Sequence, residues 1–342
     1  MSAEAWVRQW WAGRAGAAGA AATAAFAPAE GLFRTGVAAR NAAYDRGWMR
    51  AERVAVPVIS IGNLAVGGAG KTPFAAWIAA RLLEWGRTPA IALRGYGEDE
   101  VILHRELNPT IPVFSAAKRA DAAREAVAAG RDVVVLDDGF QHRALARDLD
   151  VVLIAAESWT AQPRLLPRGP WREGLGALAR AGVIVLTRKT APLARAEEIA
   201  ALLGRMQPTT PVAICALTPA PGLRMLHGGG LLVDAGMVRG HSVLAVAALA
   251  TPEPFLEHAR QMAAEVDAAL FRDHHAFTRD DVTALLQRAA GRPVLMTQKD
   301  AVKLRELIPA GVDAYVVEQH VTLERGGDAL DAALRTALEA RG

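Results

Sequence analysis

From about residue 54 onward, short runs rich in β-branched residues alternate with longer stretches rich in Ala and Leu. Short apolar runs without polar alternation are typical of strands buried on both faces, and the Ala/Leu-rich stretches between them are typical of helices. The alternation predicts βαβ units and therefore a parallel sheet covered by helices on both faces. The predicted strands are 56–60, 89–93, 132–139, 150–156 and 181–188, and the predicted helices include 73–86 and 120–130.

A stretch rich in Gly and Pro at 218–230 follows the apolar run 211–217 and indicates a linker. Strand and helix patterns then resume, which predicts a second, smaller α/β domain over residues 221–325 that closes over the first, 36–220. The last residues, 326–342, predict a helix that returns to the first domain. In the second domain we expect strands at 242–249, 293–297 and 313–317 and helices near 252–264, 279–289 and 301–307.

The N-terminal region, residues 1–35, allows two interpretations. Its Ala/Gly-rich part, 15–29, is too short and too weakly apolar to span a bilayer, which takes ~20 apolar residues. The aromatic residues near the start share one face of a helix. That face fits a helix lying in a membrane interface, and equally a helix packed on the protein's own core. The residues on it are Trp6, Val7, Trp10 and Trp11, with Arg8 and Arg14 available to reach headgroups.

Composition narrows the classes of partner. The chain has 342 residues, 52% of them hydrophobic, which suffices for a substantial core but not for a protein with many membrane spans. Its single cysteine, Cys215, cannot form an internal disulfide and indicates a reducing compartment. The net charge of +3 suits an anionic ligand or membrane surface, and we expect no nucleic-acid partner because no basic run carries interleaved aromatic residues.

The stretch SIGNLAVGGAGKTPF, 60–74, lies between a predicted strand and a predicted helix. Its glycines and the Lys-Thr pair that follows them match a phosphate-binding loop, in which backbone N–H groups and a helix N-terminus surround the phosphates. Ala65 stands where the common pattern has its first glycine. The sequence therefore predicts a P-loop NTPase-like first domain. The expected nucleotide-binding residues are Asn63, Gly67, Gly68, Ala69, Gly70, Lys71 and Thr72.

Two aspartates, Asp137 and Asp138, end the predicted strand 132–139. Nucleoside triphosphate sites of this kind place an acidic residue after an apolar strand to hold Mg²⁺, and the hydroxyl after the loop lysine is a second ligand. We therefore expect Thr72, Asp137 and Asp138 to form a magnesium site.

Three classes of nucleotide protein fit these motifs. A deviant-loop ATPase switch needs a lysine where this chain has Val66. A GTPase would use TQKD, 297–300, but that motif lies far past the loop, and Asp300 is more simply a helix cap. A small-molecule kinase needs an acceptor site and a base. Polar loops that could supply these follow the phosphate loop, with Gln141 and His142, with Arg168, Arg172 and Glu173, and with Asp273, His274 and His275.

Taken together, the motifs resemble the tetraacyldisaccharide 4′-kinase family. The segments that carry the resemblance are SIGNLAVGGAGKTP, LRGYG, VVLDDGFQHRAL, LLPRGPWRE, FRDHHAFT and LMTQKDAVKL. The resemblance implies transfer of the γ-phosphate of ATP, with Mg²⁺, to the 4′-hydroxyl of an anionic tetraacylated glucosamine disaccharide 1-phosphate. The product would be lipid IVA, in lipid A and lipopolysaccharide biosynthesis. A nucleotide switch acting on a protein partner is the alternative.

The resemblance also implies roles for residues. Lys71 contacts phosphates, Asp99 takes the proton from the sugar hydroxyl, and His274 or its neighbour His275 orients that carboxylate. The segment that carries Asp99 is shorter than in the family, Val101 replaces a proline, and Gln298 replaces a glutamate. The residues expected near substrate and nucleotide are Arg94, Tyr96, Gln141, His142, Arg172 and Glu173.

An acylated substrate gives the N-terminal region a function. The first 53 residues carry seven arginines against four acidic residues, which suits anionic headgroups. We expect peripheral attachment to the cytoplasmic face of the inner membrane, with no obligate protein partner.

Overall fold

The computed structural model describes residues 3–95 and 98–340. Its larger sheet has eight strands in the order β14-β7-β6-β5-β1-β4-β2-β3. All neighbouring pairs are parallel except β14 with β7. The predicted parallel sheet is confirmed. Its strands are β1 (Val58–Asn63), β2 (Pro89–Arg94), β3 (Val113–Ala116), β4 (Val133–Asp137), β5 (Leu149–Ala155), β6 (Val183–Arg188), β7 (Val212–Pro219) and β14 (Gln319–Arg325).

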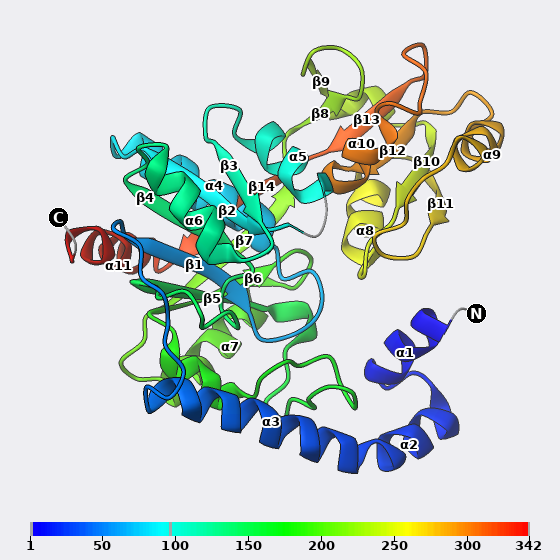
Figure 1. Cartoon of the computed structure of the whole chain (residues 1–342). Coiled ribbons are helices and arrows are strands. Elements are labelled where there is room, and N and C mark those ends of the chain that lie inside the picture. The colour runs from blue at the N-terminus through cyan, green and yellow to red at the C-terminus, as the bar shows by residue number, and fades with distance from the viewer. Residues whose placement is uncertain (1–2, 96–97, 341–342) are drawn as a thin grey trace.

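Helices cover both faces of this sheet (Figure 1). Side chains alternate between the faces, so that Val135 packs with α4 and α11 while Val134 and Leu136 pack with α6. The helix α7 covers the same sheet around β6 and β7. Both faces of the sheet are buried, which explains the continuous apolar runs in the sequence. The helices are α4 (Lys71–Glu84), α5 (Glu98–Leu107), α6 (Arg119–Ala128), α7 (Leu193–Met206) and α11 (Gly327–Glu339), with short 3₁₀ turns at Ala156–Ser158, Leu175–Arg180 and Ala235–Val238.

The smaller sheet has six strands in the order β11-β10-β12-β13-β8-β9. Its central strands are parallel, and β8 and β9 add an antiparallel edge. Apolar clusters lie on both faces, one with α9 and α10 and the other with α8. The elements are β8 (Gly222–Met225), β9 (Leu232–Asp234), β10 (Ser242–Ala247), α8 (Glu253–Met262), β11 (Glu265–Leu270), α9 (Arg279–Ala289), β12 (Val294–Thr297), α10 (Gln298–Leu304) and β13 (Ala314–Val317).

The cap of α10 differs from the expectation. Thr297, not Asp300, is the N-cap residue, and its hydroxyl accepts a hydrogen bond from the Asp300 N–H at 3.2 Å. The buried carboxylate of Asp300 accepts from the Thr297 hydroxyl at 2.7 Å and from the Ala248 N–H. Asp300 therefore ties the start of α10 to the end of β10.

The chain crosses between the two sheets twice, after β7 and before β14. Residues 319–325, which the sequence analysis assigns to the smaller domain, pair with β7 in the larger sheet, with Gln319 opposite Pro219. The difference arises because the alternation of polar and apolar residues in 319–325 does not show which sheet the strand joins, and only its pairing with β7 decides this. The final helix α11 packs against β7, β1 and β5, and residues such as Leu330 and Leu334 are buried there.

Three helices form an N-terminal arm, α1 (Ala3–Trp11), α2 (Gly16–Ala25) and α3 (Ala27–Asp45). The helix α3 runs along the outside of the first domain, and α1 lies toward α8 of the second domain (Figure 1), where Arg8 Nη1 donates to the Leu249 carbonyl at 3.2 Å. The indole N–H of Trp10 donates to the Thr23 hydroxyl at 2.8 Å, and the Trp10 ring is buried against Trp6 and Phe26. The indole N–H of Trp11 donates to the Pro167 carbonyl at 3.0 Å. Part of the aromatic face thus packs on the protein itself. Among the described helices, none is long and apolar enough to cross a membrane.

Candidate active site

A cavity of about 760 Å³ opens at the carboxyl ends of β1, β2 and β4 and is closed from the other side by the second domain. The loop 66–73 forms its floor, as expected for ligands of open α/β sheets. The second domain contributes the start of α8, residues 273–274 and residues 297–299. Both domains therefore line one site.

The phosphate loop owes its shape to two glycines with positive φ, Gly67 (122°) and Gly70 (82°). A Cβ at Gly70 would lie 2.1 Å from Leu217 Cδ1, so this position is closed to any side chain. Ala65 has no positive φ, and its carbonyl accepts a hydrogen bond from the Asn63 side chain at 2.7 Å. The first glycine of the common pattern is therefore not needed for this loop.

Lys71 and Asp138 form the charged centre of the loop. Lys71 Nζ lies 3.3 Å from Asn63 Oδ1 and 3.5 Å from Asp138 Oδ1. Arg172 holds the same carboxylate at 3.2 Å. Burial alone would raise the pKa of Asp138, but the positive charges of Lys71, Arg172 and Arg119 outweigh it and lower that pKa. Asp138 is therefore ionised at neutral pH.

Asp137 ends β4 with its side chain 4% exposed. Its Oδ2 accepts two hydrogen bonds, from Thr72 Oγ1 at 2.9 Å and from His104 Nε2 at 3.0 Å. Its Oδ1 is buried and has no hydrogen-bond partner in the described part of the chain. A buried carboxylate oxygen beside the hydroxyl that follows the loop lysine is the donor set that Mg²⁺ takes at a nucleotide site. These residues fit that ion.

Gln141 and His142, which follow the two aspartates in the same sequence motif, also line the cavity. Gln141 Nε2 donates to the Asn63 carbonyl at 2.6 Å and so braces the end of β1. The pKa of His142 is lowered to about 4, first by burial and then by the charges of Arg119 and Arg94. At neutral pH the His142 ring is therefore uncharged and can donate or accept a hydrogen bond.

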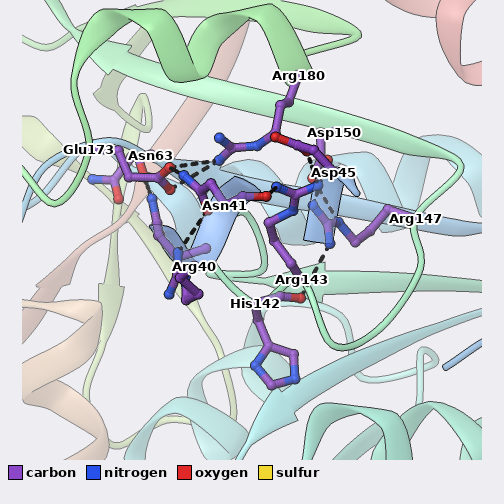
Figure 2. A network of polar contacts seen from close by, with 11 residues as sticks. Arg40, Asn41, Asp45, Asn63, His142, Arg143, Arg147, Asp150, Glu173 and Arg180 are labelled. Carbon is purple, nitrogen blue, oxygen red and sulfur yellow. Dashed lines mark hydrogen bonds and ion pairs between the residues drawn. The ribbon is translucent and has the colours of Figure 1, made fainter. Parts of the chain in front are cut away.

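Arg172 and Glu173 point in different directions. Arg172 lines the cavity. Figure 2 shows Glu173 in a separate network with Asn41 and Arg180, and the ring of His142 pointing away from that network. The Glu173 carboxylate, in a residue that is 2% exposed, accepts hydrogen bonds from Asn41 Nδ2 at 2.7 Å and from Arg180 Nη2 at 3.0 Å. Glu173 thus joins α3 to the loop, and the structure does not bring it to the cavity.

The structure separates Asp99 from the histidines. Lys303 Nζ lies 3.1 Å from Asp99 Oδ2, and Asp99 does not line the cavity. His274 does, but its ring contacts Lys299 Nζ at 3.2 Å. Asp99 therefore pairs with Lys303 and His274 contacts Lys299, whereas Asp99 and His274 were expected to pair with each other.

His275 lies outside the cavity. Its Nε2 donates to Asp281 Oδ2 at 3.0 Å, and its ring stacks on Phe271 with centroids 4.8 Å apart. Its role is structural in this arrangement. Arg94 lines the cavity, and Tyr96 lies outside the described residues.

The site also contains residues that were not predicted, among them the following four. Glu100 lines the cavity, and its pKa is raised by burial and by the charge of Asp137. Arg119 is buried nearby, and burial lowers its pKa. Lys189 Nζ donates to the Gly68 carbonyl at 2.9 Å, and its pKa is lowered by burial. The fourth is His104. A helical pattern over 98–107 would have placed Glu100 and His104 four residues apart on one face.

Known proteins are similar along almost the whole chain. A sequence model of the LpxK family, described as Tetraacyldisaccharide-1-P 4′-kinase, matches residues 22–101 and 97–339. A tetraacyldisaccharide 4′-kinase of Anaeromyxobacter dehalogenans is 42% identical over 95% of this chain and 93% of its own, and one of Halorhodospira halophila is 35% identical over 93% and 94%. A crystal structure of an "apo" form of LpxK from Aquifex aeolicus in complex with ATP has a TM-score of 0.72 at 25% identity, and the match covers 92% of this chain and 99% of that chain.

Proposed function

The chain belongs to the tetraacyldisaccharide-1-phosphate 4′-kinase family, and from this premise we propose that phosphate transfer takes place in the cavity between its two sheets. It is an ATP-dependent phosphotransferase with an alcohol acceptor, and the alternative of a nucleotide switch is not favoured. The observation that carries the proposal is the position of the Thr72–Asp137 pair directly beside Lys71, at a cavity lined by both domains.

In this proposal the phosphates of ATP lie against the N–H groups of residues 67–72 and the N-terminus of α4. Lys71 turns from Asp138 toward the outer phosphates, which leaves Asp138 paired with Arg172. Lys189, on the other side of the loop, fixes the Gly68 carbonyl and adds positive charge near the phosphates. The "apo" LpxK structure from Aquifex aeolicus is a complex with ATP, which supports ATP as the nucleotide.

Magnesium would be held by Thr72 and Asp137. When bound, the ion neutralises charge that develops on the transferred phosphoryl group. The protein's own contribution is to keep the Asp137 carboxylate in one orientation and to keep water from its buried face.

The sugar hydroxyl must lose a proton as it attacks phosphorus. We assign this proton to Asp99, with His274 orienting the carboxylate. The assignment requires Lys303 to release Asp99 and Lys299 to release His274 when the substrates bind. The adjacent Glu100 is the competing carboxylate, since it lines the cavity in the structure and its pKa is raised.

The acyl chains of the substrate lie in a bilayer, so the enzyme must work at a membrane surface. The N-terminal arm and the turn that follows α3 expose large apolar side chains, among them Leu32 in the arm at 77% and Trp48 in the turn at 76%. An arm with exposed apolar residues and excess arginine is suited to an anionic interface. We place the arm peripherally on the cytoplasmic face of the inner membrane.

The direct test is transfer of labelled phosphate from ATP to a tetraacyl disaccharide 1-phosphate in detergent micelles with Mg²⁺. The wild-type chain should label the lipid and Lys71→Ala should not. Hydrolysis of ATP without labelled lipid would contradict the proposal.

A further inference from the structure

His104 lies directly beneath the proposed magnesium site. It is on the inner face of α5, and its side chain is 0% exposed. The helix α5 packs against α4, which carries Thr72, and against α10 of the second domain. His104 therefore connects three parts of the molecule that meet at the cavity.

The contact with Asp137 is specific. Since a carboxylate oxygen only accepts, Nε2 of the ring carries a proton and donates to Asp137 Oδ2 at 3.0 Å. Thr72 donates to the same oxygen at 2.9 Å. Two donors converging on Oδ2 fix the rotation of the carboxylate and leave Oδ1, buried and without a partner among the described residues, for a cation.

The other ring nitrogen argues against a purely structural role. His104 Nδ1 is buried and has no partner among the described residues. Burying a polar atom in this way costs free energy, so an apolar residue would pack at this position more favourably. The benefit of a histidine here is its single hydrogen bond to Asp137.

We propose that His104 is a positioning residue that holds Asp137 in the orientation needed to ligate magnesium. The inference rests on the magnesium site proposed above and adds a residue that the sequence motifs do not contain. Groups that hydrogen-bond to metal ligands orient them and typically change metal affinity by about 10–100-fold when removed.

The same helix links this contact to the second domain. Arg305, which follows α10, lies 3.0 Å from Glu106, and Lys303 of α10 lies 3.1 Å from Asp99, so both ends of α5 contact the second domain.

The test compares three variants at one position. His104→Gln places an amide N–H₂ near the position of Nε2 and keeps the hydrogen bond. His104→Asn is too short to reach Asp137, and His104→Leu lacks a donor. Folding is checked for each by circular dichroism and thermal unfolding. The probe is Mn²⁺, whose binding is followed by its electron paramagnetic resonance signal in the presence of a non-hydrolysable ATP analogue.

We expect His104→Leu and His104→Asn to weaken Mn²⁺ binding by about tenfold or more, and His104→Gln to stay within about threefold of wild type. In lipid phosphorylation, the Mg²⁺ concentration for half-maximal rate should rise while the rate at saturating Mg²⁺ falls less. Equal Mn²⁺ affinity in wild type and His104→Asn would overturn the proposal. If His104→Leu fails to fold, the Asn and Gln pair decides alone.

Asp137→Asn is the control for the underlying site. It should abolish Mn²⁺ binding at the protein whatever residue 104 is. Retained Mn²⁺ affinity in Asp137→Asn would refute the magnesium site itself. If Asp137→Asn loses Mn²⁺ binding while His104→Asn keeps the wild-type Mn²⁺ affinity, only the role of His104 is refuted.

Discussion

Lys71 Nζ lies 3.5 Å from Asp138 Oδ1, so the cation of the phosphate loop already faces a carboxylate of the neighbouring strand end. Replacing Lys71 by Ala should reduce kcat/KM for lipid phosphorylation by about 100-fold or more, because one charged contact to the transferred group is lost. Unfolding should change little, since Arg172 still pairs with Asp138. Steady-state kinetics and thermal unfolding measure both, and Lys71→Arg controls for loss of charge.

Asp99 and Glu100 can be distinguished as bases by matched amides. Asp99→Asn should lower kcat by about 10²–10⁴-fold, the usual contribution of a general base, and Glu100→Gln by clearly less. Single-turnover transfer at saturating ATP and lipid gives the comparison. The reverse order of effects would assign the proton to Glu100, which the structure places at the cavity.

The pKa of His142, about 4, predicts a pH effect on stability. The folded protein disfavours the charged ring while the unfolded chain, with an ordinary pKa near 6.5, accepts the proton. The stabilisation is therefore complete above pH ~6.5 and is lost as the pH falls toward ~4. His142→Gln should make the melting temperature fall less steeply across this range. Parallel melting curves for wild type and variant would show that His142 does not contribute.

The N-terminal arm should carry membrane binding. Replacing Leu32 and Trp48 by Asp should reduce flotation with anionic vesicles severalfold, and binding of the wild type should weaken with salt. Leu231→Asp is the matched control, because Leu231 is 56% exposed on the second domain. Equal losses for the arm variant and the control would mean that the arm has no special role.

Glu173 should matter for stability. Glu173→Gln removes the negative charge opposite the half-buried Arg180 and should lower the free energy of unfolding by about 1–3 kcal/mol. Urea denaturation measures the change. Glu197→Gln, in an exposed pair with Arg325, is expected to stay within about 0.5 kcal/mol. A negligible loss in Glu173→Gln would show that the network in Figure 2 is not stabilising.

The strands and the phosphate loop could be predicted from the sequence, because each depends on residues that are close together in the chain. Strands such as β4 are continuous apolar runs, and the phosphate loop follows one of them, so the sequence alone relates Lys71, Thr72 and Asp137. In the structure Thr72 contacts Asp137, and their assignment to a magnesium site stays a prediction. The helix α5 was missed because acidic residues crowd its first turn and no clear apolar face is visible in the sequence. Unless residues 98–107 are known to be helical, the sequence does not show which of Asp99 and Glu100 faces the cavity. It also gives no relation between His104 and Asp137. Those relationships depend on how α5 packs against α4 and α10.

Long-range pairing explains the other differences. Arg172 and Glu173 are adjacent in one loop but face opposite directions. Arg172 pairs with Asp138, and Glu173 pairs with Arg180. The strand β14 is recognised only through its ladder with β7. Partners far away in the chain decide both cases.

The return of the chain to the first sheet also sets an order of assembly during synthesis. Gln319 pairs with Pro219, and α11 then buries Leu330 and Leu334 against strands made much earlier. During translation, the edge of β7 has no partner strand and the apolar face that α11 covers is exposed until the whole smaller domain has been made. The smaller domain can fold in that interval, because its sheet uses only residues already made. The core of the first domain is therefore completed only after the smaller domain has been made, when α11 packs against β7, β1 and β5.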